Sequence, residues 1–214
     1  MKELVIVGCG GFAAEITEYI EQNNTATSTS LVVKGYVDVD AAAHQRYGLQ
    51  YPYLGSDEDI KLSDVELIIA IGDVRIRNIV FEKLKNMGGR FYTFTHHTAN
   101  IAKSAVIGNG VVICPNVIIG PKVEVRDNCI FNYNSTIAHD CSIDEGNVFS
   151  PAVVVTGYVK IGRKNLFGVG SKVTPSVSIG NHNKIQAGVI VAQDIPDKKI
   201  VYQKRDIKMI TSIY

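Results

Sequence analysis

The stretch of residues 101–196 decides the fold of this chain, and it begins IAKSAV IGNGVV ICPNVI when it is written in sixes. Sixteen hexads follow one another without an insertion or a deletion. The first residue of every hexad is apolar: Ile101, Ile107, Ile113, Ile119, Val125, Phe131, Ile137, Ile143, Phe149, Val155, Ile161, Phe167, Val173, Ile179, Ile185 and Val191. Hexapeptide periodicity of this kind predicts a parallel β-helix, in which each hexad forms one short strand and one corner.

Two further positions of the hexad support this prediction. The fifth residue is Ala, Val, Cys, Ser, Asn or Ile, and it is never charged. A glycine follows the first residue in five hexads, at Gly108, Gly120, Gly162, Gly168 and Gly180. We expect these glycines to adopt positive φ at tight corners, where other residues would be strained.

Three hexads would make one triangular turn. Residues 18 apart would then lie above one another at about 4.7–4.9 Å, the spacing of paired strands, and the stretch would make about five turns. Asn147, Asn165 and Asn183 follow this interval at one hexad position. Their side chains are therefore expected to form hydrogen bonds along a ladder.

The composition limits the functions open to the chain. Its 214 residues carry a formal net charge of +1, which excludes the basic field of a nucleic-acid-binding surface. No apolar run has the length of a signal peptide or a membrane-spanning helix. The four scattered cysteines are interpreted as buried hydrophobes in a reducing compartment: Cys9, Cys114, Cys129 and Cys141. We expect a cytoplasmic protein with room for one large or two small domains.

The N-terminal part of the chain, residues 1–98, alternates between strand and helix patterns, as in an α/β unit. We expect strands at residues 4–7, 31–37, 67–73 and 91–94, and helices at residues 13–22 and 75–87. The chain is accordingly predicted to fold as a Rossmann-like domain over residues 1–98, followed by an all-β parallel helix over residues 99–214.

A glycine-rich turn connects the first strand to the first helix. Gly8, Gly10 and Ala13 fit the pattern G-x-G-x-x-A, whose bare backbone lets a phosphate approach the N-terminus of a helix. Asp38 ends the second strand, where this fingerprint places the residue that binds a ribose. Such a turn can be purely structural, but its context favours a nucleotide. A nicotinamide enzyme is disfavoured, because the unit is about half a dinucleotide fold and a β-helix follows it.

Several motifs resemble those of the bacterial nucleotide-sugar N-acetyltransferases. That family acetylates UDP-4-amino sugars of the bacillosamine route or GDP-perosamine, and the sialic-acid acetyltransferases are its relatives. The N-terminal half contributes residues 8–11 (GCGG), Asp38, residues 70–73 (AIGD), Arg75, Arg77 and His96. The coil contributes the most specific motifs, at residues 136–141 (TIAHDC), 150–151 (SP) and 156–162 (TGYVKIG). The resemblance covers nearly the whole chain and implies a left-handed β-helix.

The resemblance also implies roles for individual residues. The catalytic base would be His139, with Asp140 as its acidic neighbour. Acetyl-CoA would be the cosubstrate, lying between the coils of a homotrimer and touching Gly157, Ala187 and Gly188. The nucleotide sugar would be held by Gly8, Gly10, Gly11, Asp38, Asp73 and His96. One departure is that residues 201–206 read VYQKRD where the family has Gly-x-Pro-Ala-Lys, which leaves the distal end of coenzyme A without its usual partners.

The spacing of the hexads brings two of these residues together. His139 is the third residue of its hexad and lies three hexads before Gly157, so the two should stack on successive turns. An imidazole can accept the proton of an attacking amine, and a backbone N–H can stabilise the oxyanion formed from a thioester. Asp140 could orient the imidazole, or it could instead pair with Lys122, three hexads earlier. His182 is interpreted as a solvated turn residue, and His96 as a structural or substrate-lining residue.

Three alternatives use a similar fold. The chain could acetylate a sugar hydroxyl, or bind a nucleotide sugar without catalysis, although an intact His139–Gly157 pair argues against a binding protein. A zinc hydratase needs several outward histidines around a metal, and the coil offers only His139 and His182, so we predict no metal. The favoured prediction is an acetyl-CoA-dependent N-acetyltransferase for a nucleotide-linked amino sugar, such as a 4-amino-4,6-dideoxy sugar for a surface glycan or lipopolysaccharide.

Overall fold

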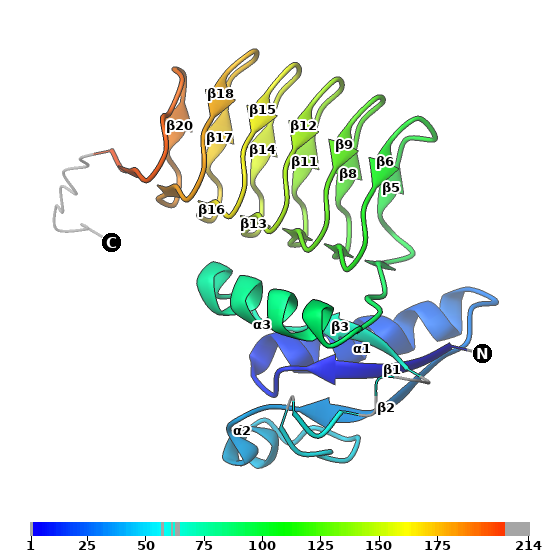
Figure 1. Ribbon diagram of the computed structural model, residues 1–214. Coiled ribbons are helices and arrows are strands. Elements are labelled where there is room, and N and C mark those ends of the chain that lie inside the picture. The colour runs from blue at the N-terminus through cyan, green and yellow to red at the C-terminus, as the bar shows by residue number, and fades with distance from the viewer. Residues whose placement is uncertain (1, 57, 61, 63–64, 204–214) are drawn as a thin grey trace, which may run out of the picture.

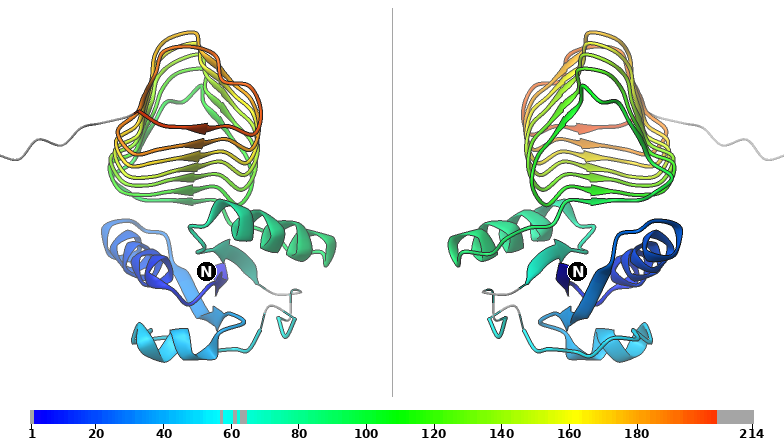
Figure 2. Two further views of the ribbon diagram at one scale, coloured as in Figure 1. Left: turned by 90° about the vertical axis from the view of Figure 1, so that its left-hand side faces the viewer. Right: turned by 90° about the vertical axis from the view of Figure 1, so that its right-hand side faces the viewer.

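A computed structural model describes residues 2–203, with the exception of residues 57, 61, 63 and 64. It consists of a small N-terminal α/β unit and a long parallel β-helix, which we call the coil (Figure 1). Seen along its axis, the coil is a triangular tube, and one flat side of the triangle faces the α/β unit (Figure 2). The predicted α/β unit followed by a parallel β-helix is confirmed.

The α/β unit is built on a parallel sheet with the strand order β2-β1-β3. Its strands are β1 (Lys2–Val7), β2 (Leu31–Val37) and β3 (Glu66–Ile69), and its helices are α1 (Gly11–Ala26), α2 (Ala41–Arg46) and α3 (Val74–Asn86). Successive residues of β1 pack on opposite helices. Leu4 and Ile6 belong to the cluster that contains α1, whereas Val5 and Val7 belong to the cluster that contains α3. Burial on both faces explains why residues 4–7 of this strand are all apolar.

The strand expected at residues 67–73 ends earlier, at Ile69, and two further elements differ from the sequence prediction. The short helix α2 was not expected, since six residues are too few to show a helical period. It begins because the Asp40 carboxylate accepts a hydrogen bond from the Ala42 N–H at 3.0 Å. The predicted strand at residues 91–94 is divided between two sheets. Phe91 makes a single bridge to Leu67, whereas β4 (Phe94–Thr95) pairs with a strand of the coil, so the coil begins before residue 99.

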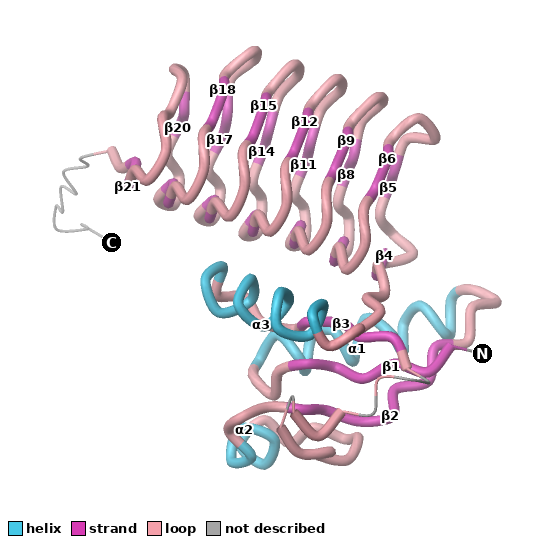
Figure 3. Tube along the Cα trace, viewed as in Figure 1, coloured by secondary structure: helices cyan, strands magenta, loops and turns pink. Residues whose placement is uncertain are grey.

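Each of the three faces of the coil is a parallel sheet of two-residue strands joined by turns (Figure 3). The seven-stranded face contains β4, β7 (Val112–Ile113), β10 (Ile130–Phe131), β13 (Val148–Phe149), β16 (Leu166–Phe167), β19 (Lys184–Ile185) and β21 (Ile200–Val201). The six-stranded face contains β5 (Asn100–Ile101), β8 (Ile118–Ile119), β11 (Thr136–Ile137), β14 (Val154–Val155), β17 (Lys172–Val173) and β20 (Ile190–Val191). The five-stranded face contains β6 (Val106–Ile107), β9 (Glu124–Val125), β12 (Ser142–Ile143), β15 (Lys160–Ile161) and β18 (Ser178–Ile179).

The predicted turn of three hexads is confirmed by the strand register. Ile137 pairs with Ile119 on one side and with Val155 on the other. The interval shortens only at the C-terminal end, where Lys184 pairs with Ile200, two positions short of three hexads. The last turn is therefore smaller than the others.

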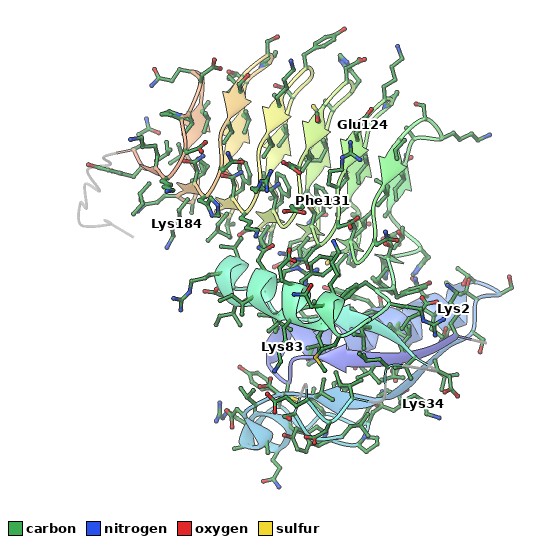
Figure 4. The ribbon with its side chains drawn as sticks, in the orientation of Figure 1. Lys2, Lys34, Lys83, Glu124, Phe131 and Lys184 are labelled. Carbon is green, nitrogen blue, oxygen red and sulfur yellow. The ribbon has the colours of Figure 1, made fainter. Side chains whose placement is uncertain are left out.

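The first residue of each hexad fills the interior of the tube. Phe131, Phe149 and Phe167 form a column there, with ring centroids 4.7 and 4.6 Å apart and interplanar angles of 9° and 7°. Phe131 is labelled in Figure 4. These separations match the spacing of paired strands, so one aromatic ring per turn fits without strain.

The prediction that the second-position glycines adopt positive φ is wrong. Positive φ occurs at the fourth residue of each hexad from Gly110 to Gly188, with values between 55° and 69°, and not at the glycines that follow the first residue. Those second-position glycines are needed for space. A Cβ atom on Gly168 would lie 2.5 Å from the Ala187 nitrogen, and one on Gly120 would lie 2.9 Å from the His139 nitrogen. The close approach of successive turns, rather than positive φ, selects glycine there.

The asparagine ladder is confirmed. Asn147 Oδ1 accepts hydrogen bonds from the backbone N–H and the side-chain amide of Asn165, at 2.9 and 3.0 Å. Asn165 Oδ1 in turn accepts from the Asn183 N–H at 2.7 Å, and Asn183 Oδ1 accepts from the Lys199 N–H. The ladder satisfies polar backbone groups along one edge of the coil.

The α/β unit covers the seven-stranded face. The outward residues Val112, Ile130 and Val148 are at most 2% exposed. Arg77 of α3 is fully buried, and its guanidinium donates to the carbonyls of Ile69, Gly110 and Asn128. Burial lowers the pKa of Arg77 to about 9, so it remains charged at neutral pH. We call this covered side of the coil the docked side.

All four cysteines lie within the described residues, and each is buried and unpaired. Burial raises the pKa of Cys9, Cys114 and Cys129 to about 12, so their thiols are protonated at neutral pH. This confirms their interpretation as buried hydrophobes.

Candidate active site

His139 lies in the corner that joins β11 to β12. This corner belongs to a row of corners between the six-stranded and the five-stranded face, at residues 102–105, 120–123, 138–141, 156–159 and 174–177. We call this row the outer edge, because it runs along the side of the coil that points away from the α/β unit (Figures 1 and 2). Half of the His139 side-chain surface is exposed there.

Asp140 orients the imidazole of His139. Its Oδ2 atom lies 2.8 Å from His139 Nδ1, while the φ of Asp140 is +55°. A carboxylate at this distance holds the hydrogen on Nδ1 and leaves Nε2 as a proton acceptor. Nε2 has no hydrogen-bond partner within the described part of the chain. The alternative pair between Asp140 and Lys122 is not formed, since no ion pair joins these two described residues.

Gly157 lies directly above His139, as the spacing of three hexads predicts. A Cβ atom on Gly157 would lie 2.7 Å from Cε1 and 2.9 Å from Nε2 of the imidazole, so only glycine leaves room for the ring. The Gly157 N–H finds no acceptor among the described residues. A proton acceptor and an unused backbone donor therefore lie side by side on the outer edge.

A proline lies on each side of this pair along the outer edge. Pro121 lies one turn before His139 and Pro175 lies one turn after Gly157, both at the third position of their hexads. The next residue at these corners has positive φ, as in a type II turn, which favours proline at the preceding position. Proline carries no N–H. The pair of His139 and Gly157 is thus flanked on the outer edge by two positions without an N–H.

One aromatic residue beside the pair was missed by the sequence analysis. The Tyr158 ring stands edge-on to the imidazole, with centroids 5.1 Å apart, and Tyr158 is 59% exposed. Its position after Gly157 was visible in the sequence, but a fourth-position residue could only be placed against His139 once the corner geometry was known.

The glycine-rich turn lies at the carboxyl ends of β1 and β3. Gly8 has a φ of +114°, and a Cβ atom on it would lie 2.9 Å from the Ala70 carbonyl oxygen. Gly10 caps the N-terminus of α1, and Gly11 is the first residue of that helix. The Tyr47 ring follows the unexpected helix α2 and was also missed; a Cβ atom on Gly11 would lie 3.4 Å from it. Gly10 and Gly11 thus bring a backbone without side chains to the N-terminus of α1, the end of a helix that attracts anions.

Asp38 is engaged with this turn through its carboxylate. Its Oδ2 accepts a hydrogen bond from the Cys9 N–H at 2.7 Å, and its Oδ1 accepts from the Asp40 N–H at 3.0 Å. Charge-assisted bonds of this kind hold a loop in place. Asp38 therefore shapes the glycine turn directly.

The other two predicted substrate residues, Asp73 and His96, are held by hydrogen bonds of their own. Asp73 caps α3, where its Oδ1 accepts from the N–H groups of Arg75 and Ile76 at 2.9 Å. His96 is only 2% exposed and uses both ring nitrogens, 2.8 Å from Thr98 Oγ1 and 2.9 Å from Gln22 Oε1. In this chain His96 contributes to the junction between α1 and the coil.

The structure brings the predicted residues together in two separate groups. His139, Asp140 and Gly157 gather on the outer edge, whereas Gly8, Gly10, Gly11, Asp38 and Asp73 gather on the α/β unit, beneath the docked side (Figure 1). Ala187 and Gly188 lie at the opposite edge of the six-stranded face, between β19 and β20. His182 is exposed, as expected, at a corner next to the docked side.

Two properties of the described residues bear on membranes and metals. None of the described helices combines the length and hydrophobicity that a membrane span requires. Within residues 2–203, apart from the four omitted positions, no three His, Cys, Asp or Glu side chains come together as a group of metal ligands.

Two family models match the chain. Residues 3–84 match the PglD N-terminal domain, and residues 104–139 match the bacterial transferase hexapeptide repeats. A curated relative is the UDP-N-acetylbacillosamine N-acetyltransferase of Bacillus subtilis (strain 168), which is 29% identical over 113 residues. That alignment covers 53% of this chain and 51% of the relative, so the match spans about half the length of that protein.

Solved structures share the whole architecture. PerB from Caulobacter crescentus, crystallised with CoA and GDP-perosamine, is 29% identical with a TM-score of 0.80, and the match covers 92% of each chain. A histidine-to-asparagine variant of the perosamine N-acetyltransferase from the same organism is 26% identical with a TM-score of 0.82, covering 94% of each chain. The acetyltransferase domain of PglB from Neisseria gonorrhoeae, at 23% identity and a TM-score of 0.78, shares the fold. By its two family-model matches and its shared architecture, the chain is similar to bacterial sugar N-acetyltransferases.

Proposed function

We propose that this chain transfers an acetyl group from acetyl-CoA to the amine of a nucleotide-linked amino sugar, such as a 4-amino-4,6-dideoxy sugar for a surface glycan. The observation that carries the proposal is that the imidazole of His139, 2.8 Å from Asp140 at Nδ1, lies beside Gly157 on the outer edge, with its Nε2 and the Gly157 N–H both unused. Relatives that bind CoA and GDP-perosamine share this architecture.

The residues support a direct transfer in two stages. As the sugar amine forms a bond to the thioester carbonyl carbon, Nε2 of His139 accepts a proton from the amine, and the Gly157 N–H donates to the oxyanion. When the carbon–sulfur bond breaks, the imidazolium returns its proton to the leaving thiolate, and the amide remains. General-base catalysis is typically worth about 10²–10⁴ in rate. One oxyanion donor is worth about 10²–10³.

The site is completed by a second copy of the chain in this proposal. The glycine turn and Asp38 lie beneath the docked side, whereas His139 lies on the outer edge of the same coil (Figures 1 and 2). A nucleotide held on the glycine turn would thus present its sugar to the outer edge of a neighbouring coil. The uncovered apolar residues Ile118 and Ile190 of the six-stranded face, 47% and 59% exposed, provide a surface for that neighbour. We propose a homotrimer.

The chemistry is tested by measuring thiol release from acetyl-CoA in the presence of UDP-, GDP- and dTDP-linked amino sugars. Each amino sugar is matched with the corresponding sugar that carries a hydroxyl in place of the amine. Release with an amino sugar only, abolished by His139→Ala, is the expected result. Release with the hydroxyl sugars alone would show an O-acetyltransferase. Nucleotide-sugar binding without any release would show a binding protein.

The shared site is tested by mixing two inactive variants. His139→Ala removes the base, and Asp38→Ala disturbs the glycine turn on the opposite side of the chain. After the two are unfolded, mixed and refolded together, some interfaces combine an intact His139 with an intact glycine turn. Recovery of activity in the mixture, and in neither variant refolded alone, is expected. A mixture as inactive as its components would place both groups in a site within one chain.

A further inference from the structure

A cleft separates α3 from the coil on the docked side, away from His139 and Gly157. It has a volume of about 710 Å³ and lies between the first two turns of α3 and the corners of the coil that join the five-stranded to the seven-stranded face. One wall includes Asp73, Arg75 and Ile79 of the α3 region, and the other includes Lys164, His182 and Lys184 of the coil. Figure 4 shows Lys184 on the side of the coil that faces α3.

The two walls are held at a fixed separation. Arg77 donates from α3 to the carbonyls of Gly110 and Asn128 in the coil, at 3.1 Å each. The Asn78 side chain, one residue further along the helix, donates to the Gly146 carbonyl at 2.9 Å. Both side chains are buried, so they anchor α3 beside the cleft. The cleft is thus a built feature of the docked chain rather than a gap between two mobile parts.

Positive charge predominates in the cleft. Arg75, Lys164 and Lys184 line it, and none of the three forms an ion pair with another described residue. The opposing carboxylates are Asp73 and Glu82, and Asp73 already accepts two backbone hydrogen bonds as the cap of α3. Three unpaired cations around one hollow raise the local concentration of anions.

Apolar surface accompanies these charges. Leu166 lies half-buried at the back of the coil wall, and Ile79 is 61% exposed on the helix wall. A small inorganic ion would leave this surface unused. A ligand that carries both a ring and a phosphoryl group would use the apolar surface as well as the cations.

We propose that this cleft binds a phosphate-bearing small molecule, with Lys164, Lys184 and Arg75 on its phosphoryl oxygens and with Ile79 and Leu166 against its apolar part. Asp73 follows β3 beside the glycine turn, so the phosphoryl group can have two sources. It can belong to the nucleotide held on that turn, or to a separate phosphorylated ligand. The anion site does not depend on the proposed acetyl transfer, because its groups lie on the docked side and not on the outer edge.

The test is calorimetric titration of the full chain with inorganic pyrophosphate at low salt. The double variant Lys164→Gln/Lys184→Gln is compared with Lys34→Gln/Lys160→Gln, which removes the same charge from exposed lysines outside the cleft. We expect the cleft variant to weaken pyrophosphate binding at least tenfold and the control variant to weaken it less than twofold. Equal thermal unfolding midpoints for both variants show that the fold is retained.

Two results would overturn the proposal: no saturable binding of pyrophosphate by the unaltered chain, or an equal loss in both double variants. Titration with UDP and GDP then separates the sources. A matching tenfold loss in the cleft variant assigns the cleft to the diphosphate of the nucleotide. Unchanged nucleotide binding with weakened pyrophosphate binding assigns it to a separate ligand. Neither titration requires acetyl transfer, so failure here leaves the proposed function untouched, and the converse also holds.

Discussion

The seven-stranded face of the coil, on the docked side, and the six-stranded face are built from the same hexad, but only the first is covered. Val112, Ile130 and Val148 point outward from the seven-stranded face and are at most 2% exposed beneath the α/β unit. Ile118 and Ile190 occupy the same hexad position on the six-stranded face, yet they are 47% and 59% exposed. The backbone repeats without change from one face to the next, so the outward side chains and their cover set the difference.

We infer from this difference that the docked side stabilises the fold, whereas the outer edge carries the groups for acetyl transfer. On the docked side, buried apolar and polar groups hold two parts of the chain together. On the outer edge, His139 and Gly157 contribute little to packing and are available to a ligand. Substitutions on the docked side should therefore lower the free energy of unfolding, and substitutions on the outer edge should lower the rate of acetyl transfer.

The largest effect is expected for His139→Ala, which should lower kcat by about 10²–10⁴ with little change in KM, because the base acts in the transition state. Steady-state kinetics with acetyl-CoA and an amino sugar measure both parameters. The residual rate should rise with pH, since more of the substrate amine is then neutral without the base. The unfolding midpoint should stay within a few degrees, because the side chain is half exposed. A near-normal kcat at neutral pH would remove His139 from the mechanism.

The comparison between the faces is tested directly by Ile130→Ala and Ile190→Ala. Ile130 is fully buried on the docked side, so its truncation should cost about 2–5 kcal/mol in the free energy of unfolding. Ile190 is exposed in the single chain, and its truncation should cost less than about 0.5 kcal/mol under conditions that dissociate any assembly. Urea denaturation measures both values. An equal decrease in the free energy of unfolding for the two variants would mean that the two faces are equally buried within the chain.

Asp140→Asn should have an intermediate effect on the outer edge. The amide can still occupy the position 2.8 Å from Nδ1 but stabilises the imidazolium less, so we expect kcat to fall about tenfold. Lys122→Gln is the matched control, because Lys122 lies one turn before Asp140 and forms no ion pair with it. A larger loss in the lysine variant than in the aspartate variant would restore the rejected pairing of Asp140 with Lys122.

The smallest effect should appear at His96 on the docked side. Burial, followed by the charge of His97, lowers the pKa of His96 in the folded chain. The unfolded chain, with a histidine pKa of about 6.5, therefore binds more protons, and stability is lost as the pH falls below that value. Urea midpoints at pH 7.5 and 5.5 should show a smaller acid loss in His96→Asn than in the unaltered chain. An identical loss in both proteins would show that His96 does not titrate on unfolding.

Much of the fold could be predicted from the sequence because each hexad repeats the same pattern of buried and exposed positions. An apolar first residue every six positions, and three asparagines 18 apart, constrain the coil many times over. The helix α2 could not be predicted in this way, since its start depends on a single capping carboxylate. The role of the second-position glycines was misjudged because the space they leave is filled by the next turn, three hexads further on.

The candidate site was predicted in part. The stacking of His139 and Gly157 follows from spacing alone, and the structure shows it. The pairing of Asp140 with His139 rather than with Lys122 depends on side-chain orientation at a corner with positive φ, which no spacing reveals. The distance between the two groups of predicted residues, on opposite sides of the coil, depends on which face the α/β unit covers. That choice is made by buried contacts such as those of Arg77 with the Gly110 and Asn128 carbonyls, which the spacing of motifs does not reveal.

The shortened last turn has a consequence for aggregation. A coil whose strands end in open hydrogen-bonding edges could add the end of another coil, turn upon turn, as fibrils do. Here the final pairing of Lys184 with Ile200 falls two positions short of the regular interval, so the terminal turn no longer has the outline of those beneath it. A second coil placed on the last described turn would not find the outline of its own turns there. The shortening thus disfavours continued stacking on the last described turn of the coil.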